Sequence, residues 1–134
     1  MSGRPRMLCV SSRFLFPVDS GGKIRTTQVL RGLRDGAFDV TLASPAPAGA
    51  RERFARELDE VCHRFVAWPA PTRGALFQIA RLRWLASGLP ISVLTDRSAP
   101  GAAVVERLLG ERPAVVVVDF PHAAMLLPGR LEVP

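Results

Sequence analysis

Cysteine and long hydrophobic runs are both scarce in this sequence. The chain of 134 residues has two cysteines, Cys9 and Cys62, and each lies within a short apolar run, which favours buried, reduced thiols. The longest uninterrupted apolar runs, such as residues 114–118, fall far short of the ~20 residues that a membrane-spanning helix needs. The apolar stretch at residues 7–10 leads into two serines and an arginine instead of a secretory cleavage site. We therefore expect a cytoplasmic protein.

The common nucleotide-binding motifs and metal-ligand spacings are also missing. No G-x-G-x-x-G is present, and a P-loop ending at Gly22 and Lys23 would need glycine in place of Pro17 and serine or threonine in place of Ile24. No helix-turn-helix, zinc-ligand spacing or basic strand with interleaved aromatic residues occurs either. These absences argue against ATPases, dinucleotide-dependent enzymes and nucleic-acid-binding proteins, and we expect no metal cofactor.

Acidic residues are nearly absent from the first quarter of the chain. Before residue 35, Asp19 is the one acidic residue, against these basic residues: Arg4, Arg6, Arg13, Lys23, Arg25, Arg31 and Arg34. The formal net charge is +6, and the rest of the chain is balanced, so the whole positive excess lies in this quarter. A localised positive field suits a phosphate-bearing ligand or another anionic surface. The alternative is a general preference for arginine, because Lys23 is the one lysine present.

The residues that are present suffice for one folded domain. Hydrophobic residues make up 48% of the chain and charged residues 22%, a balance typical of a protein with a core. Apolar runs predict strands at residues 6–12, 38–43, 61–68 and 112–119, with a weaker extended run at 91–95. Helical spacing predicts helices at residues 23–34, 50–60, 74–87 and 98–111, and a short one at 121–127.

This alternation of strands and helices predicts an α/β fold, a Rossmann-like three-layer sandwich with a mainly parallel sheet. Right-handed crossovers place the first strand centrally and give the order 3-2-1-4 for the four strong strands. His63 falls inside the third predicted strand, where we expect a structural role. Asp119 closes the fourth strand, where we expect it to cap the following helix; the alternative is a role as a base.

The turn after the first strand is the strongest candidate for a binding site. In open α/β sheets ligands bind beyond the carboxyl ends of the strands, which is where this turn must lie. Gly21 and Gly22 let the backbone approach a ligand closely, and free N–H groups at the start of the next helix stabilise phosphate oxygens. Lys23 and Arg25 add positive charge. The alternative is a plain joint between loop and helix.

Several stretches together resemble the opening of the family 4 glycosyltransferases, most closely bacterial members associated with exopolysaccharide and capsule assembly. They are residues 7–14 (MLCVSSRF), Pro17 with 19–26 (DSGGKIRT), 30–33 (LRGL), 39–42 (DVTL), 88–90 (GLP) and 112–122 (RPAVVVVDFPH). The resemblance covers nearly the whole chain. The stretch S-G-G-K-I-R is its more specific part, whereas many Rossmann-like domains share the rest.

The resemblance implies a GT-B enzyme, in which two Rossmann-like domains face each other across a cleft. Residues 1–134 would be a single N-terminal, acceptor-side domain, truncated before the C-terminal donor-binding domain. It implies that Gly21, Gly22, Lys23 and Arg25 lie against the donor diphosphate, and that His122 lies near the transferred sugar as a catalytic residue. The alternative for His122 is a surface or capping histidine.

The resemblance also implies a hexosyltransferase whose partners are a nucleotide-sugar, a glycan or lipid-linked acceptor and a donor-binding domain, in this protein or a separate chain. Such a chain alone would be inactive. Arg81, Arg83 and Trp84 lie on a largely apolar predicted helix and favour an anionic membrane surface, so a peripheral position on the inner face of the cell membrane is expected as well. The alternative for that helix is packing within the fold. Two other functions stay open: a non-catalytic Rossmann-like nucleotide- or phosphate-binding module, and the acceptor subunit of a split glycosyltransferase.

Overall fold

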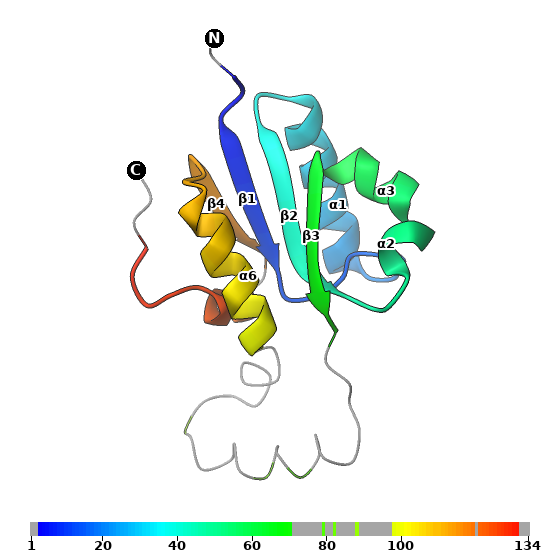
Figure 1. Cartoon of the computed structure of the whole chain (residues 1–134). Helices are drawn as coiled ribbons and strands as arrows, with labels where there is room; N and C mark the ends of the chain where they lie inside the picture. Colours follow the sequence, from blue (N-terminus) through cyan, green and yellow to red (C-terminus); the bar gives the residue numbers. More distant parts are fainter. Residues whose placement is uncertain are drawn as a thin grey trace.

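Four parallel strands form a single sheet in the order β3-β2-β1-β4, and Figure 1 shows all four arrows pointing the same way. The strands are β1 (Arg6–Ser11), β2 (Asp39–Ala46), β3 (Arg64–Pro69) and β4 (Val115–Asp119). The computed structural model describes residues 3–70, 98–119 and 121–131, together with residues 79, 82 and 88. The predicted α/β Rossmann-like fold and its strand order are confirmed. The predicted strand at 91–95, nearly all of the predicted helix at 74–87, and Arg81, Arg83 and Trp84 lie outside the described residues.

Helices cover both faces of the sheet (Figure 1). One face carries α1 (Gly21–Asp35), α2 (Ala50–Arg53) and α3 (Ala55–Val61), and the other carries α6 (Ala99–Gly110) and the 3-10 helix η2 (Pro121–Leu126). Alternate side chains of β1 point to opposite faces, as the pleat of a strand requires. Met7 and Cys9 accordingly join the core under α1 and α3, whereas Leu8 and Val10 join the core under α6. Burial on both faces explains why β1 is a continuous apolar run.

Strand β2 is longer than predicted. The sequence predicts a strand at 38–43 and a proline-rich loop from residue 44, but β2 runs on to Ala46 and contains Pro45, which pairs with Trp68 of β3. Proline is tolerated here because β1 pairs with β2 only as far as Ala43, so the strand beyond that point has one neighbour and needs fewer backbone donors.

Strands β3 and β4 begin later than predicted. Cys62 has an extended backbone but caps the end of α3, donating its N–H to the carbonyl of Leu58, so β3 starts only at Arg64. Arg112 has φ 54, a left-handed conformation that no strand accommodates, and β4 therefore starts at Val115. His63 therefore lies in the turn before β3 and not inside the strand, where the sequence predicts it.

The single helix predicted at 50–60 is two short helices that meet at Phe54. This residue has φ −113 and ψ 25, outside the helical range, and its ring turns toward the loop that follows β1. The ring of Phe54 stacks on that of Phe16, with centroids 5.8 Å apart, and lies 5.7 Å from that of Phe14. Aromatic packing with a distant segment therefore overrides the local helical spacing.

Helix α6 approaches β3 closely at Gly101, in its first turn. A Cβ added at Gly101 would lie 2.7 Å from Cε2 of Trp68 and 3.1 Å from Cδ2 of Leu126. The Trp68 side chain is buried, with 4% of its surface exposed. Ser98 caps this helix by accepting a hydrogen bond from the N–H of Gly101 at 3.2 Å. Only a residue without a side chain fits at this point of contact.

Candidate functional site

The start of α1 lies at the carboxyl end of β1, where ligands bind in folds of this kind. The helix begins at Gly21, not at Lys23 as predicted, so the glycine pair forms its first turn. Ser20 caps the helix, its hydroxyl accepting from the N–H of Lys23 at 3.5 Å. No acidic side chain lies in the first turn, so the positive end of the helix dipole is not offset there.

The backbone at Gly21 is open to an approaching ligand. Gly21 is exposed, and a Cβ added to it would meet no atom of the described residues within 4 Å. Gly22 is half-buried. The glycine pair therefore gives access to the helix start, as the sequence predicts for a phosphate site.

The loop between β1 and α1 is anchored by its aromatic and aliphatic side chains. Leu15 and Phe16 are buried in the core under α1 and α3, with 2% and 5% of their surfaces exposed. The ring of Phe14 lies 5.9 Å from those of both Phe16 and Phe65. The exposed residues just before α1 therefore follow a well-packed segment, which fixes where the helix starts.

Lys23 is already paired within its own loop. Its ammonium group lies 2.9 Å from Oδ1 of Asp19 and donates to the carbonyl of Pro17 at 3.2 Å. The hydrogen bond from Lys23, together with its charge, lowers the pKa of Asp19 below its usual value. A phosphate ligand would have to compete with Asp19 for this lysine. The carboxylate is mostly exposed, and such surface ion pairs are weak enough to exchange partners.

Arg25 is the better placed of the two predicted cations. It is exposed, and no ion pair among the described residues includes it. It lines a groove of about 180 Å³ between α1 and β4, together with Thr26, Val29, Val117 and Asp119. Its guanidinium is therefore an available positive charge close to the start of α1.

Asp119 ends β4 beside Ser11, the last residue of β1. We expected its carboxylate to cap the helix that follows, but Oδ1 accepts a hydrogen bond from the hydroxyl of Thr26 in α1 at 3.0 Å. The hydroxyl of Ser11 lies 3.4 Å from Oδ2, although its shorter bond, at 2.9 Å, goes to the carbonyl of Arg13. Asp119 thus joins the end of β4 to α1. The predicted strand order indicates part of this arrangement, because it places Ser11 and Asp119 on neighbouring strand ends.

His122 lies in η2, just beyond the carboxyl end of β4, and is half-buried. Within the described residues it makes no ion pair and no side-chain hydrogen bond. His63 lies near the amino ends of β2 and β3 instead, where its Nδ1 accepts from the N–H of Val40 at 3.0 Å. His122 is therefore the histidine at the edge of the sheet where ligands are expected.

A larger hollow, which the sequence does not predict, lies at the same edge beyond the ends of β2 and β3. It measures about 670 Å³ and is lined by small and apolar residues, among them Ala46, Trp68 and Pro69, with Arg51 and Glu52 of α2. The run of alanine, proline and glycine at residues 46–49 is the one sequence signal, because small side chains leave this space open.

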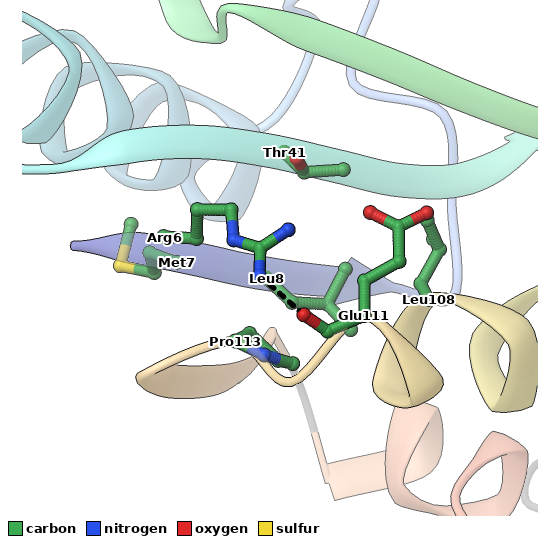
Figure 2. Close-up of a pocket in the computed structure, with 7 residues that line it drawn as sticks. All are labelled: Arg6, Met7, Leu8, Thr41, Leu108, Glu111 and Pro113. Carbon is green, nitrogen blue, oxygen red and sulfur yellow. Dashed lines mark hydrogen bonds between the residues drawn. The ribbon is translucent and has the colours of Figure 1, made fainter. Parts of the chain in front are cut away.

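The opposite end of the sheet carries a charged cluster whose groups are already paired. Arg6, at the start of β1, donates to the backbone carbonyl of Glu111, as Figure 2 shows, and Arg64 lies 2.7 Å from Oε2 of the same glutamate. The hydrogen bond from Arg64 lowers the pKa of Glu111. The cavity beside them holds about 10 Å³, space for about one water molecule. This cluster ties β1, β3 and the end of α6 together and leaves no room for a larger ligand.

A scan against protein-family models and searches of curated proteins and of solved structures found no match to this chain. In the described part of the chain no helix is long and apolar enough to span a bilayer. Nor do three or more side chains of histidine, cysteine or acidic type gather there in the way that a metal ion requires.

Proposed function

We propose that this chain is the acceptor-side domain of a GT-B glycosyltransferase of the family 4 type. In this role it helps to transfer a sugar from a nucleotide-sugar to a glycan or a lipid-linked acceptor, and the start of α1 contacts the donor diphosphate. The observation that carries the proposal is the open backbone at Gly21, at the positive end of a 15-residue helix. Arg25, which makes no ion pair with any residue that the structure describes, lies in the next turn.

The chemistry of sugar transfer explains what these groups would do. When the bond between sugar and phosphate breaks, negative charge grows on the departing nucleoside diphosphate. Backbone N–H groups at Gly21 and Gly22 are fixed donors that stabilise this charge as it develops, and the side chains of Lys23 and Arg25 add positive charge beside them. Groups held in place before the reaction contribute most, and the packed loop before α1 holds this helix start in place. A second domain supplies the remaining donors.

The other features of the same edge fit the two remaining parts of the reaction. His122 follows the end of β4, where the resemblance places a histidine near the transferred sugar. The hollow beyond β2 and β3 offers space for the acceptor, with small and apolar residues in its wall and the oppositely charged residues Arg51 and Glu52 at its border. An apolar wall with charged side chains at its border suits a hydroxyl-rich ligand, because it offers both apolar contact and hydrogen bonds.

Titration of the whole chain with UDP and with GDP, followed by amide chemical shifts, tests the proposal. We expect binding in the millimolar range, about −4 kcal/mol, since half of the site is present, with the largest shifts at Gly21 and Gly22. Arg25→Gln should weaken binding several-fold. Arg31→Gln is the matched control, because it removes the same charge from the same helix at a residue paired with Glu60. No shifts at α1, or equal effects of the two substitutions, would refute the proposed site. Micromolar binding by this chain alone would favour a self-sufficient nucleotide-binding module instead.

A further inference from the structure

We infer that Asp119 is a positioning residue for this site: through its hydrogen bond to Thr26 it holds the first half of α1 against the carboxyl end of the sheet. The inference rests on the proposed function, because it concerns how the same helix start is kept in place. Asp119 itself would not touch the diphosphate.

The burial pattern of α1 shows what this bond adds to the packed loop that precedes the helix. From Gly21 to Arg25 every residue is exposed or half-buried, and the first buried side chain of the helix is that of Thr26. The next side chain, Thr27, is also buried, but its hydroxyl bonds to carbonyls of the same helix, at Lys23 and Ile24. The bond from Thr26 to Asp119, at 3.0 Å, is therefore the link to the sheet that lies nearest the glycine pair.

Asp119 is suited to this task because a carboxylate is a strong acceptor. Hydrogen bonds to an ionised group are stronger than those between neutral groups, so a single bond of this kind helps to orient a rigid helix. The bond joins residues that lie 93 positions apart in the chain and links α1 to the strand next to β1. The position of the helix start is thus coupled to the end of β4.

The sign of the change in binding distinguishes a positioning role of Asp119 from a simple effect of its charge. A carboxylate close to a diphosphate repels it, so if Asp119 acted only through its charge, removal of that charge would strengthen binding. As a positioning residue it has the opposite effect, since loss of the tether frees the helix start and weakens binding. Thr26 allows a second test, because its substitution alters the tether without altering any charge.

The experiment compares Thr26→Val, Thr26→Ser and Asp119→Ala with the unchanged chain, in the UDP titration followed at Gly21 and Gly22. Thr26→Val keeps the shape of the side chain but removes the donor, and we expect it to weaken UDP binding about three- to tenfold. Thr26→Ser keeps the hydroxyl and should restore binding to within about twofold. Asp119→Ala removes the acceptor of the bond together with the charge and should also weaken binding. Urea titrations confirm that each variant is folded under the conditions of the measurement.

The results distinguish a failure of the inference from a failure of the proposed function. If the unchanged chain binds UDP at α1 and Thr26→Val binds it equally well, the bond has only a structural role and the inference is wrong. Tighter binding by Asp119→Ala would also overturn it, because the effect of charge would then exceed that of the lost tether. If UDP causes no shifts at α1 in the unchanged chain, the proposed function fails, and the inference fails with it.

Discussion

The contact between Gly101 and Trp68 gives the sharpest test of the packing. In Gly101→Ala the new methyl group would lie 2.7 Å from Cε2 and 2.8 Å from Nε1 of the indole ring, well inside normal contact distance. The ring is buried and Leu126 closes the other side at 3.1 Å, so α6 must shift away from β3. Overpacking of this kind costs about 1–3 kcal/mol. Helix propensity offsets up to about 1 kcal/mol of that, because alanine favours a helix over glycine.

Gly32→Ala is the matched control for this substitution. Gly32 lies in the interior of α1 and is exposed, and an added Cβ would have no atom within 4 Å in the part of the chain that the structure describes. The same change there should stabilise the protein by about 0.5–1 kcal/mol. Urea unfolding followed by circular dichroism measures the change in stability of both variants. With a slope of about 1–3 kcal/mol per molar, we expect the midpoint of Gly101→Ala to fall by roughly 0.5–1 M and that of Gly32→Ala to rise.

Trp68→Leu identifies the source of the strain. Leucine lacks the indole ring, so it removes both of the atoms nearest to the new methyl group. Combined with Gly101→Ala, it should cost less than the sum of the two single changes, because the smaller side chain makes room. If Gly101→Ala is as stable as the unchanged protein, or if the two changes simply add, the close approach of α6 to β3 is wrong.

Two further predictions concern ionisable side chains away from the carboxyl edge. Burial raises the pKa of the Cys9 thiol to about 12 and that of Cys62 to about 11, so neither should react with iodoacetamide at pH 8 until denaturant unfolds the chain. Arg64→Gln should raise the pKa of Glu111, which the hydrogen bond from Arg64 holds below its usual value, and carboxyl shifts in a pH titration measure this. Since that pKa is lowered by folding, the carboxylate stabilises the protein above its ordinary pKa, and the contribution disappears as the pH falls through the lowered value.

Each of these two predictions has an outcome that would contradict it. Rapid labelling of either cysteine in the native protein would mean that the core under α1 and α3 opens readily. For Glu111, the control is Arg107→Gln, which removes a more weakly coupled charge and should change the pKa less. An equal effect of the two arginine substitutions would show that the bond between Arg64 and Glu111 is not formed in solution.

Local sequence was sufficient to predict the sheet, because each strand carries its own burial pattern. The run from Met7 to Val10 is apolar at every position, as burial on both faces of a parallel sheet requires. Once the strands and helices are recognised, the fixed handedness of the crossovers allows few orders, and the observed order 3-2-1-4 is the expected one. The glycine pair was likewise predicted to lie at the carboxyl end of β1, because the turn after a strand has no other place to go.

Only the tertiary structure decided which side chains meet at that edge. Lys23 carries a charge that suits phosphate, but whether it is free depends on its distance from Asp19, which the fold of the loop sets. The bond between Thr26 and Asp119 and the break at Phe54 both join segments far apart in the chain, and local patterns carry no record of such contacts. Strand order follows from the periodicity of each segment, which is a local property, and from the handedness of crossovers, which is the same in nearly all parallel sheets. The chemistry of the edge depends on side-chain distances, which exist only once the whole chain has packed.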